Sequence, residues 1–117
     1  MITDALAEQI EASARHFRLV QAIVRLDQTR FAVKYRLVIR PDLWVQIYRN
    51  IQNDTVGLAL IYQGRRLYGR DCEADRWHRH PAEYPERHDF SAEGAQPTTI
   101  EDFLLEVGQV LVKHGLI

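Results

Sequence analysis

Cysteine is nearly absent from this sequence, because Cys72 is the only thiol in 117 residues. A single thiol can form no internal disulfide and cannot complete a cysteine-based zinc site. Such scarcity is typical of proteins from a reducing compartment. We therefore predict a cytoplasmic protein in which Cys72 is structural.

Long apolar runs are also missing. No stretch approaches the roughly 18 apolar residues that a membrane helix needs. The first residues lack the basic and then apolar plan of a secretion signal. The sequence therefore predicts a protein that is neither secreted nor membrane-spanning.

Neither a dominant charge nor a glycine-rich loop is present. Fifteen Lys and Arg residues oppose sixteen Asp and Glu residues, and the net charge of −1 gives no strong overall attraction to nucleic acid. The charge is unevenly distributed, however, since residues 15–40 carry seven basic side chains and Asp27 as the only acid. The scattered glycines form no phosphate loop, so the sequence disfavours nucleotide-dependent enzymes and predicts no cofactor.

The apolar pattern predicts one helix followed by five strands. Ile2, Leu6 and Ile10 recur at helical spacing, which indicates a helix over about 3–15. A period of two then predicts five strands, at 17–26, 31–40, 43–51, 56–62 and 65–70. The turns between these strands are short, which favours antiparallel neighbours in a meander.

The rest of the chain reads as a loop and a second helix. Residues 71–97 are rich in charge, His and Pro, show no period, and predict a long irregular segment. Thr98 followed by Glu101 resembles a capping box for a C-terminal helix that packs on the sheet and ends near Gly115. We therefore predict a single α+β domain over residues 1–117.

Three of the five histidines, His78, His80 and His88, fall within eleven residues of this predicted loop. Imidazole titrates near neutral pH, so His80 and His88 are candidate catalytic acid and base residues. The three histidines together are a weaker candidate for a metal site, because no Cys and no carboxylate at a recognised ligand spacing completes a motif. A solvated or structural histidine loop is the third interpretation.

A second group of candidates lies on the polar side of two predicted strands. Cations on the strand at 31–40 are expected to lie beside aromatic residues on the strand at 43–51, a mixture that suits single-stranded RNA. The candidate substrate-binding residues are Lys34, Arg36, Arg40, Trp44 and Tyr48, with Trp77 from the loop. The simpler interpretation is a solvated outer face, with Trp44 and Tyr48 packed under the long loop or at a dimer interface.

Several of these residues resemble a known family. The stretch from Trp77 to Pro81, the later His88 after Tyr84-Pro85, and the helix start from Pro97 to Leu104 resemble the TumE-like family of bacterial toxin–antitoxin proteins. The resemblance covers nearly the whole chain and implies an N-terminal helix, an antiparallel meander, a Trp/His/Pro loop and a C-terminal helix. It also implies an antitoxin as a partner.

The chain departs from the family pattern at three places. It has Arg40-Pro41-Asp42 where the family tends to have an Asp-Gly-Ser turn, and Tyr48-Arg49 where the family has an acidic residue. An Asn-containing run before the paired histidines is also absent. The resemblance thus supports Trp77, His80, Pro81 and His88 as shared loop residues.

Three hypotheses follow for function. The first is a toxin-like protein that acts on RNA through His80 and His88 without metal and remains active in EDTA. The second is a noncatalytic interaction module that forms a homodimer or binds a partner protein. The third is a metal-dependent hydrolase that uses His78, His80 and His88.

Overall fold

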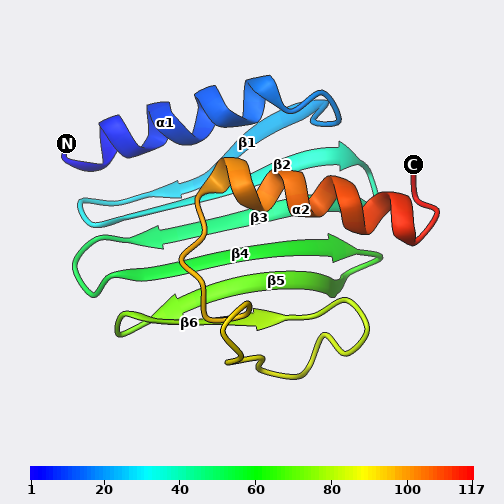
Figure 1. Cartoon of the computed structure of the whole chain (residues 1–117). Coiled ribbons are helices and arrows are strands. Elements are labelled where there is room, and N and C mark those ends of the chain that lie inside the picture. The colour runs from blue at the N-terminus through cyan, green and yellow to red at the C-terminus, as the bar shows by residue number, and fades with distance from the viewer.

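The computed structural model describes residues 1–117, which form an α+β fold with two helices on one face of an antiparallel sheet (Figure 1). The sheet is a simple meander in which each strand pairs with the next along the chain. In order, the elements are α1 (Thr3–His16), β1 (Ala22–Gln28), β2 (Ala32–Arg40), β3 (Leu43–Asn50), β4 (Thr55–Tyr62), β5 (Arg65–Glu73), β6 (Arg76–His80) and α2 (Ile100–Lys113).

The sheet has six strands, so the prediction of five was wrong. The missed strand, β6, lies in the segment that was predicted to be irregular, and β5 also extends three residues beyond its predicted end. Ala74 and Asp75 join the two strands with φ values of 50° and 61°. Residues other than glycine rarely adopt such values, and this hairpin lacks the usual Asn-Gly or Asp-Gly signal.

Two element boundaries also differ from the prediction. The strand expected at 17–26 begins only at Ala22, because residues 17–21 are a connection whose apolar side chains still pack against the core. The N-cap of α2 is Thr99 and not Thr98, since the Thr99 hydroxyl accepts a hydrogen bond from the N–H of Asp102 at 3.1 Å. Gly115 does end the helix, with a φ of 67° that suits glycine.

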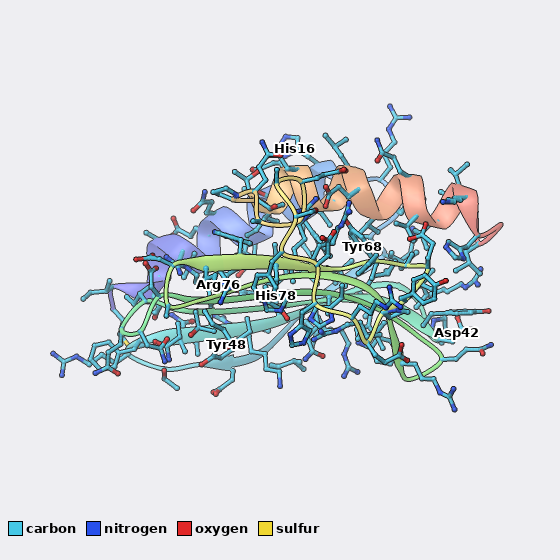
Figure 2. The ribbon with its side chains drawn as sticks, turned by 60° about the horizontal axis from the view of Figure 1, so that its bottom comes forward. His16, Asp42, Tyr48, Tyr68, Arg76 and His78 are labelled. Carbon is cyan, nitrogen blue, oxygen red and sulfur yellow. The ribbon has the colours of Figure 1, made fainter.

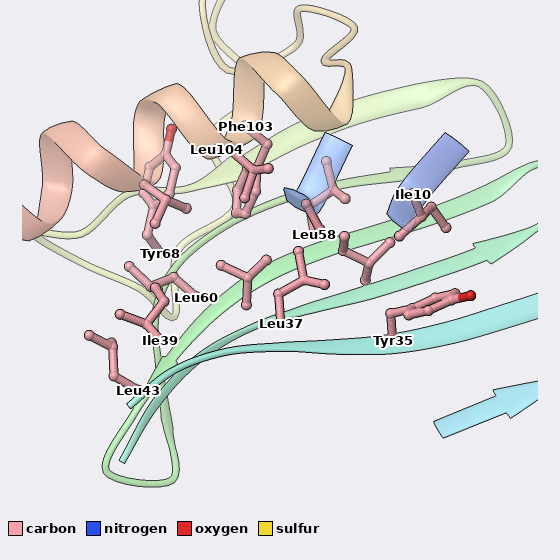
Figure 3. Close-up of a cluster of buried hydrophobic side chains, with 14 of the residues drawn as sticks. Ile10, Tyr35, Leu37, Ile39, Leu43, Leu58, Leu60, Tyr68, Phe103 and Leu104 are labelled. Atoms are coloured by element: carbon pink, nitrogen blue, oxygen red, sulfur yellow. The ribbon is translucent and has the colours of Figure 1, made fainter. Parts of the chain in front are cut away.

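The hydrophobic core lies between the helices and one face of the sheet (Figure 3). Ile10 of α1 and Phe103 of α2 are fully buried against Tyr35, Leu37 and Leu58 of the strands. Along β2 every second residue is buried, which is the burial pattern of a sheet covered on one side only. The opposite face, which we call the open face, has no helix over it.

An ion pair between the buried Arg70 and the partly exposed Glu106 anchors α2 and the loop before it to β5. The guanidinium of Arg70 donates to both carboxylate oxygens of Glu106, at 2.7 and 2.9 Å, and to the carbonyl oxygen of Glu93 at 3.0 Å. The hydroxyl of Tyr68 donates to the same carboxylate at 2.9 Å. This network fixes the path of the irregular segment, which is limited to residues 81–99.

Neither helix has the length and apolar content needed to cross a bilayer.

Candidate functional site

The open face carries the predicted mixture of cations and aromatic rings. Lys34 lies opposite Tyr48, and Val38 lies opposite Trp44, so the predicted pairing of the two strands is confirmed. The guanidinium of Arg36 lies over the Trp44 ring, 4.3 Å from its centroid, in a cation–π contact. We call Lys34, Arg36, Trp44 and Tyr48 the cation–aromatic strip. Figure 2 shows Tyr48 on the side of the sheet away from the helices.

Two predicted substrate-binding residues do not join this strip. The register shifts after Val38, and the guanidinium of Arg40 donates to Asp42 at 3.0 Å and to the carbonyl oxygen of Leu116 at 3.2 Å. Trp77 is paired with the buried Cys72 and packs against the core beneath the helices. Because successive side chains of a strand point to opposite faces, Trp77 lies across the sheet from His78.

The three candidate histidines converge with a carboxylate at one end of the open face. Asp71 of β5 is the direct cross-strand partner of His78, and His80 lies two residues further along the same face of β6. His78 Nε2 lies 3.2 Å from His80 Nε2, and Asp71 Oδ2 lies 3.6 and 3.2 Å from these two nitrogens. The third imidazole, of His88, stacks on His78 with a centroid distance of 4.6 Å. We call these four residues the histidine–aspartate cluster.

A short return of the loop to the sheet edge places His88. Asp89 forms an isolated antiparallel bridge with Arg79, with backbone hydrogen bonds of 2.8 and 3.0 Å in the two directions. The Arg79 guanidinium also lies 2.7 Å from the carboxylate of Asp89. This bridge holds the preceding residue, His88, beside β6 and therefore close to the cluster.

Burial and hydrogen bonding set the state of the two inner imidazoles. His78 and His80 are buried, whereas His88 is exposed. Burial lowers the pKa of His78, although the carboxylate of Asp71 acts in the opposite direction, so His78 is neutral at pH 7. His80 Nδ1 lies 2.8 Å from the carbonyl oxygen of Pro85. A carbonyl only accepts, so Nδ1 carries a proton and Nε2 is the atom that faces the cluster.

The cluster lines a pocket of about 500 Å³ that contains charged residues missed from the sequence. Arg66 lies in β5 with its guanidinium 3.5 Å from Asp71. Arg76 covers the ring of Phe90 at 4.1 Å on the other side. Of these charged residues, Asp71 could have been predicted from the sequence. A two-residue turn at 74–75 pairs residue 71 with residue 78, and strand alternation then places both side chains on one face.

This arrangement supports two kinds of chemistry. Imidazoles beside one another can transfer protons to and from a phosphodiester, and converging imidazole and carboxylate ligands can hold a metal ion. A thiol nucleophile is excluded by position, because Cys72 is buried on the helix-covered face, where burial raises its pKa.

Asp89, whose bridge to Arg79 places His88, should make the free energy of unfolding depend on pH in the acid range. Hydrogen bonds from Ser91, followed by the Arg79 guanidinium, lower the pKa of Asp89 to about 2 from an ordinary value of 3.8. A carboxyl with a depressed folded-state pKa stabilises the fold above its unfolded value, and this contribution is lost as the pH falls to about 2. Wild type should therefore lose stability relative to Asp89→Asn between about pH 4 and pH 2, as measured by urea unfolding. A constant difference between the two proteins over that range would contradict this assignment.

The histidine–aspartate cluster stands alone in the molecule. His78, His80 and His88 form the one group of three or more His, Cys, Asp or Glu side chains whose ligand atoms lie close together, all within 4.8 Å of one another. A larger hollow of about 850 Å³ lies nearby, between the β4–β5 turn and Pro85, but it contains no histidine.

No family model, curated protein or solved structure matches the chain.

Proposed function

We propose that the protein is a toxin-like protein that acts on RNA at the open face of its sheet, with the histidine–aspartate cluster as the reaction centre. One observation carries this proposal: the cation–aromatic strip and the cluster lie on the same face of the sheet, the one without a helix over it. Lys34, Tyr48, Gly57, Asp71 and His78 are successive cross-strand partners from β2 to β6.

The surface between the strip and the cluster suits an extended single strand. Gly57 lies between Tyr48 and Asp71 at its centre, while the neighbouring Ala59 and Gly69 are buried, with Gly69 close to the Arg66 side chain. Neighbouring strands lie about 4.8 Å apart, so Tyr48 and His78 are roughly 14 Å apart across the sheet. Rings can stack on bases and cations can contact phosphates, as in other sheet surfaces that bind single strands. An RNA strand that contacts Tyr48 could therefore place a phosphodiester at the cluster.

RNA carries its own nucleophile for this reaction. A base can remove the proton of the 2′-hydroxyl, and an acid can protonate the departing 5′-oxygen. His80 and His88 are the candidates for these roles, since His88 faces solvent and His80 Nε2 faces the pocket. The resemblance to TumE-like proteins supports a toxin role, and an antitoxin that covered the open face would block this site.

A metal-dependent hydrolase is the second candidate function. The close approach of Asp71 Oδ2 to the Nε2 atoms of His78 and His80 favours it. In this case the same face binds the substrate, and a metal-bound water supplies the nucleophile. EDTA separates the two routes, because it abolishes the second and leaves the first active.

Induced expression and RNA cleavage test the proposal together. Wild type should arrest growth and cleave single-stranded RNA, whereas His80→Ala/His88→Ala should permit growth and cleave about 10²–10⁴-fold more slowly. His16→Ala/His114→Ala is the matched control, because it removes two histidines at exposed positions at the ends of α1 and α2. It should behave as wild type.

Two results would contradict the proposal. Equal growth and cleavage by wild type and the His80→Ala/His88→Ala variant would remove the cluster from the reaction. A protein that neither arrests growth nor cleaves RNA, but forms a stable homodimer, would favour the noncatalytic interaction module.

A further inference from the structure

We propose that Asp71, His78, His80 and His88 bind one divalent transition-metal ion, with zinc as the best match. The inference deepens the second candidate function, the metal-dependent hydrolase, and is an alternative to the metal-free route, because a bound ion would occupy the Nε2 atom that His80 needs for proton transfer. It does not depend on RNA as the substrate. It extends the weak histidine-only candidate of the sequence by a carboxylate that lies on the neighbouring strand.

The distances match one face of a tetrahedral site. In such a site, ligand bonds of about 2.0–2.2 Å place two ligand atoms roughly 3.3–3.6 Å apart. The three separations among His78 Nε2, His80 Nε2 and Asp71 Oδ2 are 3.2, 3.2 and 3.6 Å. These atoms therefore form a nearly equilateral triangle, which suits ligands that point at one common ion.

His88 is the nearest candidate for a fourth ligand. Its ligand nitrogen lies within 4.8 Å of those of the other two histidines, and its ring stacks on that of His78 at 4.6 Å, so the side chain must turn to complete a tetrahedral site. His88 is exposed and belongs to the loop, so its side chain can adjust, whereas the other three ligands are fixed on paired strands. The site thus combines a rigid three-ligand face with a solvent-side ligand.

Hydrogen bonds behind the ligands support the same interpretation. His80 donates Nδ1–H to the carbonyl oxygen of Pro85 at 2.8 Å, which directs Nε2 and its lone pair into the cluster. This is the contact that orients metal-bound histidines in known sites. The Arg66 guanidinium lies 3.5 Å from Oδ2 of Asp71, the same oxygen that faces the histidines, so Arg66 must withdraw when this oxygen binds a metal ion. His80 is therefore the ligand that a residue outside the cluster orients.

The donor set identifies the class of metal. Three imidazole nitrogens and one carboxylate oxygen suit zinc and neighbouring transition metals, whereas magnesium and calcium prefer sites made of oxygen ligands. Cobalt(II) can replace zinc as a coloured probe of tetrahedral coordination. Zinc, cobalt and magnesium together therefore test both the site and its chemistry.

The experiment uses untagged full-length protein, stripped with EDTA and then titrated. Calorimetry with Zn²⁺ should give one ion per chain, Co²⁺ should give the visible absorption of a tetrahedral site, and Mg²⁺ should not bind. His88→Ala, which alters an exposed loop and leaves the strands intact, should weaken Zn²⁺ binding by at least about tenfold, as the loss of even a supporting residue does in known sites. Asp71→Ala and His80→Ala should abolish the cobalt spectrum.

The matched control is again His16→Ala/His114→Ala, which should bind as wild type. Zinc binding below one equivalent, or unchanged binding by both His88→Ala and Asp71→Ala, would overturn the inference. Zinc binding without RNA cleavage would support the metal site and refute the proposed function. RNA cleavage in EDTA by protein that binds no zinc would do the reverse.

Discussion

Glu106→Ala is expected to lower the free energy of unfolding by about 3 kcal/mol, the lower end of the range for removing one partner of a buried ion pair, because Glu106 itself is 28% exposed. The remaining partner, Arg70, is only 3% exposed. A guanidinium is not deprotonated in proteins, so Arg70 keeps its charge when the carboxylate is removed. The hydroxyl of Tyr68 loses its acceptor in the same variant.

This loss is large compared with the whole stability of a small domain, which is roughly 5–15 kcal/mol. Urea unfolding measures it directly through the shift of the midpoint at constant slope. The control is Glu83→Ala, which removes the carboxylate of an exposed ion pair with Lys113, with side chains 55% and 68% exposed. Exposed pairs contribute little, so this control should unfold as wild type. Equal midpoints for the two variants would show that Glu106 does not anchor α2.

Repetition of apolar residues was sufficient to predict most of the fold. The helix near the N-terminus, five of the six strands and the C-terminal helix follow from periods of 3.6 and 2, because one face of each element packs on the same core. The ends of the elements were predicted less accurately where two neighbouring residues could serve the same purpose. Thr98 and Thr99 can both cap a helix, and only the backbone path selects Thr99.

The site was harder to predict, since it depends on a hairpin without a sequence signal. Ala74 and Asp75 turn the chain with positive φ values that their side chains do not favour. Because this turn was not predicted, Trp77 and the three histidines were assigned to one irregular loop. Strand alternation instead separates Trp77 from His78 and pairs His78 with Asp71.

Gly94→Ala is the second change with a large expected effect. A Cβ atom at this position would lie 2.2 Å from the carbonyl oxygen of Asp89 and 2.7 Å from its Cγ. These distances are far inside van der Waals contact, and one of the atoms belongs to the backbone, so the loop must move. Such overpacking typically costs about 1–3 kcal/mol. Urea unfolding should show this loss.

The same substitution tests how His88 is positioned. Asp89 is the residue that docks the loop on β6, and His88 precedes it, so displacement of Asp89 should also withdraw His88 from the cluster. We therefore expect Gly94→Ala to weaken zinc binding to about the level of His88→Ala, while Asp71, His78 and His80 keep their places on the strands.

Gly108→Ala is the control, because a Cβ on this residue of α2 meets nothing within 4 Å. Alanine favours a helix over glycine by up to about 1 kcal/mol, so this variant should be slightly more stable than wild type and bind zinc equally well. Lower stability of Gly94→Ala with unchanged zinc binding would show that His88 is not a ligand. Unchanged stability would show that the loop accommodates the methyl group without losing its contact with β6.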